Sequence, residues 1–185
     1  MKKTLTIALL TLAVNSYASI HKEGLLCQST NQMCFYSWPD LPKLKGWTQD
    51  LDISRENEIN AQVPNGKNFN TAETIIYAKA TKAPENSKIK NISDFILNDQ
   101  NEFKKQSNMT AISEVASIES ATKVKLRCFL FKPLSSGNWE LVTYGEEADK
   151  DGQGRYFLTF VVSSKTEAGL NSNMSVYKEF INKYK

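Results

Sequence analysis

One stretch in the second half of the chain alternates hydrophobic and polar side chains with a period of two. Residues 122–133, TKVKLRCFLFKP, follow this pattern and predict a β-strand, because successive side chains of a strand point to opposite faces. Pro133 ends the strand, since proline has no backbone N–H to donate. One predicted face carries Val124, Leu126, Cys128 and Leu130, and the other carries Lys125, Arg127, Phe129 and Phe131.

Three further segments predict strands. Residues 73–81, ETIIYAKAT, are rich in β-branched and aromatic side chains. Residues 139–144, WELVTY, and 155–162, RYFLTFVV, come next, and the last is hydrophobic on both faces, which favours a central position in a sheet. Between them, residues 145–154, GEEADKDGQG, predict a hairpin connection, with Gly152 and Gly154 supplying positive φ angles.

Two segments have helical periodicity. In residues 92–105, ISDFILNDQNEFKK, Ser93 is the expected N-cap. The apolar side chains expected on one face of this helix are Ile92, Phe95, Ile96 and Phe103. Residues 175–185, SVYKEFINKYK, predict a terminal helix that Ser175 caps. Its expected buried face carries Val176, Tyr177, Phe180, Ile181 and Tyr184.

The N-terminus has the pattern of an export signal. Lys2 and Lys3 precede an apolar stretch at residues 5–14, and Ser16-Tyr17-Ala18 gives a small-x-small cleavage site. The apolar stretch is shorter than the ~20 residues that a membrane span needs. We therefore expect residues 1–18 to be a signal peptide of bacterial style and the mature protein to be periplasmic or secreted, with no membrane span after cleavage. The mature chain divides into an N-terminal segment, residues 19–44, and a domain, residues 45–185.

Charge adds little to this interpretation. The full chain carries 23 basic and 20 acidic residues, and the predicted signal carries two lysines and no acid. The mature chain is therefore nearly neutral, with 21 basic against 20 acidic residues. Such a balance gives no basic field for nucleic acid, so nucleic-acid binding is not expected.

Cysteine usage fits an oxidising compartment. Cys27 and Cys34 bracket a short segment, CQSTNQMC, whose Ser-Thr-Asn centre suits a turn, so a Cys27–Cys34 disulfide is expected. Pairing of one of them with Cys128 is the alternative. The aliphatic neighbours predicted for Cys128 favour a free, inert thiol.

No catalytic set, metal site or cofactor is predicted. The only histidine is His21, close to the expected mature N-terminus, so a histidine-based triad is disfavoured. Asp149 and Asp151 have the alternation of a calcium loop, but Gly152 comes too early and no closing glutamate follows. No phosphate-binding glycine motif is present.

The pattern of strand, helix, strand, hairpin and terminal helix over roughly residues 45–185 resembles the Mog1/PsbP-like α/β-sandwich group. The resemblance is carried by ETIIYAKAT, ISDFILNDQNEFKK, KVKLRCFLF, the hairpin from WELVTY to FVVSS, and SVYKEFINKYK. It implies an α+β fold in which helices cover an antiparallel sheet, and it implies an accessory or binding role. The Cys27–Cys34 segment departs from the pattern of the group.

These observations favour a non-catalytic interaction protein that binds another protein, for instance an immunity protein that neutralises a secreted bacterial toxin. Partner contacts are expected at the loop that carries Trp38 and Trp47, although packing of both rings on the core is the competing interpretation. A second set of contacts is expected at the hairpin tip, at Glu146, Glu147, Asp149 and Asp151. The alternatives are a small hydrolase with an unrecognised site and a carrier of a small ligand or lipid.

Overall fold

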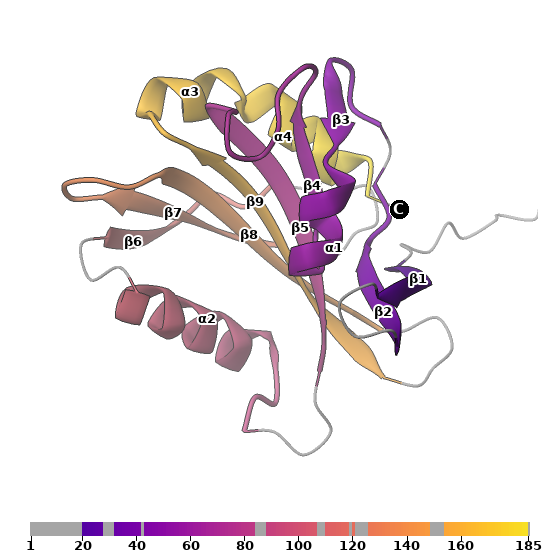
Figure 1. Ribbon diagram of the computed structural model, residues 1–185. Helices are drawn as coiled ribbons and strands as arrows, with labels where there is room; N and C mark the ends of the chain where they lie inside the picture. Colours follow the sequence, from indigo (N-terminus) through magenta and orange to yellow (C-terminus); the bar gives the residue numbers. More distant parts are fainter. Residues whose placement is uncertain are drawn as a thin grey trace, which may run out of the picture.

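The computed structural model shows a mixed α+β fold with a large antiparallel sheet (Figure 1). The predicted signal peptide lies outside the described part of the chain, and the structure therefore does not test it. The structure describes residues 20–27, 32–41, 43–83, 88–106, 110–118, 120, 126–148 and 154–184.

Seven strands of the described chain form one antiparallel sheet, and β9 lies in the middle of it. This position confirms the expectation that the strand with two hydrophobic faces is central. Only a strand covered on both sides can bury side chains of both orientations. In spatial order the strands are β3 (Trp47–Gln49), β4 (Asn60–Pro64), β5 (Thr74–Lys82), β9 (Arg155–Ser164), β8 (Trp139–Ala148), β7 (Arg127–Pro133) and β6 (Thr110–Val115).

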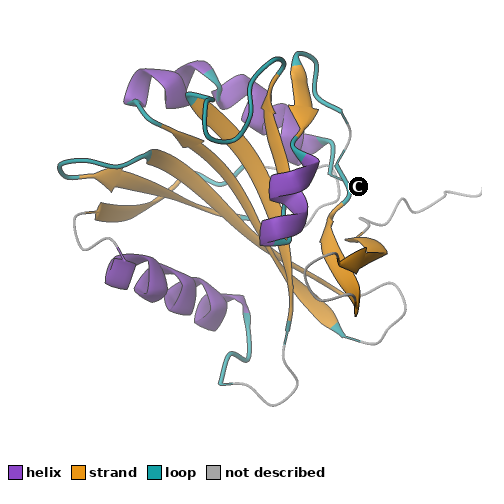
Figure 2. Ribbon diagram, viewed as in Figure 1, coloured by secondary structure: helices purple, strands orange, loops and turns teal. Residues whose placement is uncertain are grey.

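Helices lie on both sides of this sheet (Figure 2). The described helices are α1 (Leu51–Asn57), α2 (Ile92–Gln106), α3 (Glu167–Ser172) and α4 (Met174–Asn182). The positions expected for two of them, residues 92–105 and 175–185, correspond to α2 and α4. The elements α1, α3, β4 and β6 were not predicted.

One face of the sheet is covered by α3 and α4 and forms a tightly packed core. From α4, Tyr177, Phe180 and Ile181 are fully buried against Phe160 of β9. The Tyr177 hydroxyl donates to the Phe160 carbonyl at 2.8 Å and accepts from the Thr143 hydroxyl at 2.8 Å, so the polar end of this side chain is satisfied inside the core. Cys128 is a free thiol buried among leucine side chains of this core, as predicted, and its Sγ lies 3.2 Å from the same Thr143 hydroxyl.

The opposite face is covered in part by α2. Ile96 and the half-buried Phe95 and Phe103 of this helix pack against β7, β8 and β9. The ring of Phe103 meets that of Phe131 edge-on, with 4.9 Å between the centroids, and Phe95 stacks on Phe157 at 4.7 Å. The predicted division of β7 is confirmed for its described residues: Leu126, Cys128 and Leu130 join the α4 core, and Phe129 and Phe131 join the α2 side.

Three local predictions are wrong. The hairpin connection between β8 and β9 is shorter than expected, because Gly145 to Ala148 belong to β8 and pair with Leu158 to Arg155 of β9. Ser93 lies inside α2, and the Asn91 side chain caps the helix by accepting from the backbone N–H groups of Ser93 and Asp94 at 2.9 and 3.0 Å. Ser175 likewise lies inside α4, which starts directly after Asn173.

The N-terminal segment forms a separate two-stranded hairpin, β1 (Ile20–Cys27) and β2 (Gln32–Pro39). Apolar burial, a hydrogen bond and an ion pair help to attach it to the rest of the domain. Trp38 is buried, with 4% of its surface exposed. The Asn60 amide donates to the Pro39 carbonyl at 3.3 Å, and Glu23 forms an ion pair with Arg55 of α1 at 3.2 Å.

Replacement of Asn91 by alanine is expected to destabilise the protein by about 1 kcal/mol, because two N–H groups at the start of α2 lose their acceptor. The matched change Ser93→Ala removes a hydroxyl that the cap does not use, and we expect it to alter the free energy of unfolding by less than about 0.5 kcal/mol. Urea unfolding of both variants measures the difference. Equal effects of the two changes would contradict the assignment of Asn91 as the cap.

Candidate functional site

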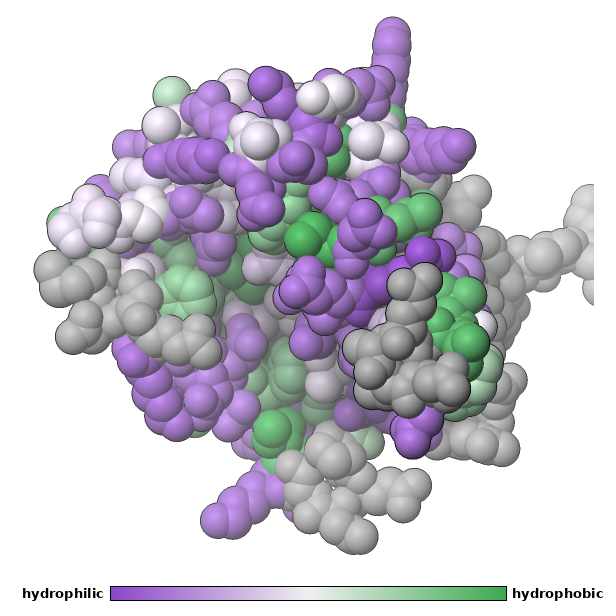
Figure 3. All heavy atoms as spheres, viewed as in Figure 1, coloured by the Kyte–Doolittle hydropathy of each residue, from purple (hydrophilic) through white to green (hydrophobic). Residues whose placement is uncertain are grey.

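The first candidate site is an apolar surface on the hairpin, which we call the hairpin face. Leu26 of β1 and Met33 and Phe35 of β2 share one side, since Leu26 pairs with Met33 and Gly24 pairs with Phe35. Their side chains are 62%, 55% and 76% exposed. Figure 3 shows hydrophobic spheres at the place where Figure 1 draws the hairpin. Three large apolar side chains therefore meet solvent together.

Gly24 allows Phe35 to lie flat across the hairpin. A Cβ atom added at position 24 would come within 3.2 Å of the Phe35 ring and 3.3 Å of the Met33 methyl group. Both distances are tighter than ordinary van der Waals contact, so a larger residue would displace these two side chains. The glycine thus shapes the hairpin face.

A shallow pocket of about 450 Å³ adjoins the hairpin face. It is lined by Gly24 and Phe35 of the hairpin and by Tyr156 at the start of β9. The Lys22 ammonium lies 5.8 Å from the centroid of the Tyr156 ring. Such a depression beside exposed apolar side chains has the size to receive one anchoring side chain of a partner.

Two of the expected partner contacts, Trp38 and Trp47, pack within the chain. The buried Trp38 ring stacks on His21, with 5.4 Å between the ring centroids. Trp47 is half-buried and packs against the α4 core. The packing interpretation of both rings is therefore confirmed, whereas a role in partner binding stays a prediction.

The acidic residues expected at the β8–β9 tip are placed only in part. Glu146 forms an ion pair with Arg155 across the hairpin at 2.7 Å. Glu147 lies beside Tyr184, whose pKa is raised by burial and by the charge of Glu147. Asp149 and Asp151 lie outside the described residues. Partner binding by these four residues also stays a prediction.

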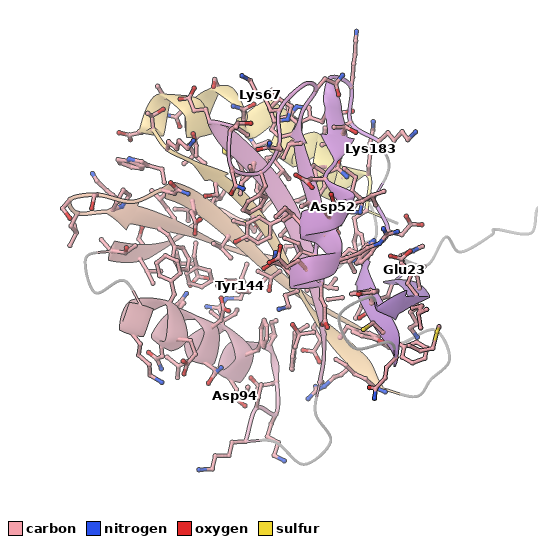
Figure 4. The ribbon with its side chains drawn as sticks, in the orientation of Figure 1. Glu23, Asp52, Lys67, Asp94, Tyr144 and Lys183 are labelled. Carbon is pink, nitrogen blue, oxygen red and sulfur yellow. The ribbon has the colours of Figure 1, made fainter. Side chains whose placement is uncertain are left out.

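The second candidate site is a groove of about 800 Å³ on the α2 side of the sheet. Because α2 covers mainly β7 and β8, the same face of β5 and β9 is left open toward α1. The floor of the groove includes Tyr77 of β5 and Glu140 of β8, and Asp99 of α2 forms part of the wall. Figure 4 shows Tyr144 between the sheet and α2. Aromatic rings contribute much of the remaining lining: Phe69, Phe95, Phe103 and Phe131.

Hydrogen bonds position the polar groups of the groove. The Tyr144 hydroxyl donates to Asp99 Oδ2 at 2.6 Å, which joins α2 to β8. Glu140 is hydrogen-bonded to the side chain of Ser163 on β9, and Asn138 Nδ2 donates to the Ser163 hydroxyl at 3.0 Å. The two carboxyl groups are therefore held by the scaffold on different sides of the groove.

Burial changes the acidity of these groups. It is the main reason that the pKa of Glu140 is raised, and the charge of Asp99 adds to it while the hydrogen bond from Ser163 acts against it. Burial also raises the pKa of Tyr77, with further contributions from Glu140 and Asp99. The groove thus disfavours negative charge, and its titratable groups interact with one another.

These residues could not be identified from the sequence. Glu140 shares a face of the strand WELVTY with the buried Val142 and Tyr144, and a single acid on an otherwise apolar strand face is a weak signal of a site. The residues of the hairpin face alternate with Cys34 and Tyr36, and this pattern could have indicated a strand with one exposed apolar side.

The described residues contain no group of three or more His, Cys, Asp and Glu side chains that could hold a metal ion. None of the helices in the described ranges is long and apolar enough to cross a membrane. The groove does combine a concave shape with desolvated acidic groups, which is what the hydrolase alternative requires. That alternative stays a prediction.

In comparisons with known proteins, no family model, no curated protein and no solved structure matches the chain. The resemblance to the Mog1/PsbP-like group therefore rests on the order of elements alone.

Cys128 is a free cysteine. The side chain of Cys27 lies outside the described part of the structure, so the Cys27–Cys34 bridge stays a prediction. We expect native protein to show no thiol that reacts rapidly with Ellman's reagent, because Cys128 is buried. Unfolding without reductant is expected to release one reactive thiol per chain. Release of three thiols would contradict the bridge.

Stability should depend on pH through Glu140. An acid whose pKa is higher in the folded state than in the unfolded state costs stability as the pH rises from the unfolded pKa through the folded pKa. Glu140→Gln keeps an acceptor for Ser163 and removes this cost. We expect the variant to match the wild type near pH 4 and to be more stable than it at pH 8.

Urea unfolding at a series of pH values measures this effect. Glu102→Gln, which changes an exposed carboxylate on the rim of the same groove, is the matched control. If the difference in free energy of unfolding between Glu140→Gln and the wild type is the same at all pH values, folding does not change the pKa of Glu140 and the prediction is wrong.

Proposed function

We propose that the protein is an exported, non-catalytic interaction module that binds another protein through the hairpin face. In its most specific form the proposal is an immunity protein that neutralises a secreted bacterial toxin in the periplasm. The observation that carries the proposal is the exposure of Leu26, Met33 and Phe35 on one side of a hairpin that is otherwise firmly attached.

Exposure of these three side chains to water is unfavourable. Burial of a Leu, Met or Phe side chain contributes about 1.5–3 kcal/mol each. The sheet buries comparable rings completely, for example Phe160 and Phe180, whereas these three side chains stay at the surface. Grouped apolar side chains on the surface of a folded domain are typical of an interaction site.

The surroundings of the hairpin face favour a protein as the partner. Two residues of opposite charge, Lys22 and Glu23, line the pocket that adjoins the hairpin face, and Glu23 also forms an ion pair with Arg55 at 3.2 Å. Figure 4 shows Glu23 at the hairpin. A rim with both signs of charge around an apolar centre is the usual composition of protein–protein interfaces. An anionic membrane surface would instead favour a predominantly basic rim.

Three further elements belong to the same proposal. Residues 1–18 act as a cleaved signal peptide and direct the chain to the periplasm or beyond. A Cys27–Cys34 disulfide stabilises the hairpin that carries the binding surface. The domain from residue 45 to 185 has the α/β-sandwich arrangement of the Mog1/PsbP-like group, in which helices cover an antiparallel sheet.

The variant Met33→Ser/Phe35→Ser is expected to lose partner binding while its fold is kept, because both side chains are exposed. Leu134→Ser replaces another exposed apolar side chain, 61% exposed and outside the hairpin, and serves as the control. The mature wild type and both variants are used as bait with native periplasm at physiological salt. Each complex is then reconstituted from purified components and its affinity is measured by calorimetry.

A one-to-one complex that buries roughly 800 Å² per partner is expected for the wild type and the control. The serine double variant should bind at least about 100-fold more weakly, since two apolar anchors are lost. Equal affinity of all three proteins would place the interface elsewhere. A wild type that recovers no partner, or that only self-associates through the hairpin face, would overturn the proposal.

A further inference from the structure

The groove on the α2 side has the dimensions of a small-molecule site. Its volume of about 800 Å³ lies within the range of ~300–1,000 Å³ that is typical of such sites. Phe95 and Phe103 of α2 line one wall, and Tyr77 and Phe131 of the sheet contribute to the floor. An aromatic surface of this kind can hold an apolar body by stacking, and it can also attract a cation to the ring faces.

Polar groups in the groove have free hydrogen-bonding capacity. The Tyr77 side chain lines the groove and is enclosed enough for burial to raise its pKa. The Tyr144 hydroxyl donates to Oδ2 of Asp99, so the other carboxylate oxygen, Oδ1, is not used by this bond. A ligand with hydrogen-bond donors could donate to this carboxylate oxygen and to the Tyr77 hydroxyl oxygen.

The carboxyl groups of the groove also lack compensating charge. In the described part of the chain no Lys or Arg forms an ion pair with Asp99 or Glu140, and Glu102 is paired with Lys105 at 2.6 Å. Lys79 lines the groove without such a contact. Two neighbouring carboxyl groups raise each other's energy when both are ionised, and a cation between them removes that cost.

We propose that the groove binds a small organic amine, with its ammonium group between Asp99 and Glu140 and its aromatic or aliphatic body against Phe95, Phe103 and Tyr77. An ammonium group donates up to three hydrogen bonds, and the groove offers acceptors on two sides. An anionic ligand would meet the same two carboxyl groups at close range and would be repelled. A neutral ligand would gain only the apolar contacts.

This site is distinct from the hairpin face, and the inference does not depend on the proposed partner. The groove lies between α2 and the β5–β9–β8 face of the sheet, and none of its lining residues belongs to the hairpin. Substitutions in the groove therefore leave the surface of the proposed protein interface unchanged.

Three probes of similar shape test the proposal: 2-phenylethylamine, the neutral 2-phenylethanol and the anionic 3-phenylpropanoate. Binding to the full mature protein at pH 7 is followed by ¹⁵N–¹H correlation spectra during titration. We expect 2-phenylethylamine to bind with a Kd of roughly 0.1–10 mM, the range for so small a ligand, and to shift resonances of Tyr77, Asp99 and Glu140. The neutral probe should bind at least about tenfold more weakly, and the anion more weakly still.

Asp99→Asn and Glu140→Gln remove the two negative charges and keep the acceptors for Tyr144 and Ser163. Each is expected to weaken binding of 2-phenylethylamine by about tenfold while the affinity for 2-phenylethanol is unchanged. Glu167→Gln, at an exposed glutamate that begins α3 on the other side of the sheet, is the matched control and should have no effect.

Two results would overturn the proposal. Equal affinity for the amine and the alcohol would show that the groove selects only for apolar surface. Absence of shifts at the groove residues, with a wild type that gives the spectrum of a folded protein, would show that the groove takes no amine. Because the hairpin variants are tested separately, either result leaves the proposed protein interface untouched.

Discussion

The structure depends on the burial of β9 from both sides. Its side chains alternate between two hydrophobic faces, so the sheet needs protein above and below its middle strand. On one face α3 and α4 cover the strand, and the side chains there form a closed core. On the other face α2 is displaced toward β7 and β8, and the remaining surface of β5 and β9 forms the groove. The unequal covering of one sheet thus produces both the stable side and the candidate ligand site.

The main strands and the two longest helices could be predicted because their periodicity reflects burial. β7 divides its side chains between the two cores as its alternation indicates, and α4 buries the expected rings. Short elements were missed because local pattern determines them weakly. α1 has only seven residues, and its N-cap Asp50 also accepts from the backbone of Phe69. That contact between distant residues has no local signature.

The candidate sites could not be predicted to the same degree, because each depends on what covers a surface. The pattern of β8 places Glu140 on a face of the strand but gives no sign that α2 stops short of it. Trp38 illustrates the converse: it was considered as a contact residue, and the Asn60–Pro39 hydrogen bond holds its strand against the domain. Exposure of Phe35 and burial of Trp38 follow from how the hairpin docks, which is a tertiary property.

The setting of Cys128 has a consequence for thiol chemistry if the chain is exported as proposed. Its sulfur sits beside Thr143 beneath α4, out of reach of other thiols and of small oxidants. Thiol–disulfide exchange requires an accessible thiolate, so in the folded chain this residue cannot take part in exchange with the proposed Cys27–Cys34 bridge. Only molecules that open the sheet become vulnerable to mispairing. The resistance of the protein to scrambling is therefore kinetic and is set by how rarely the α4 side unfolds.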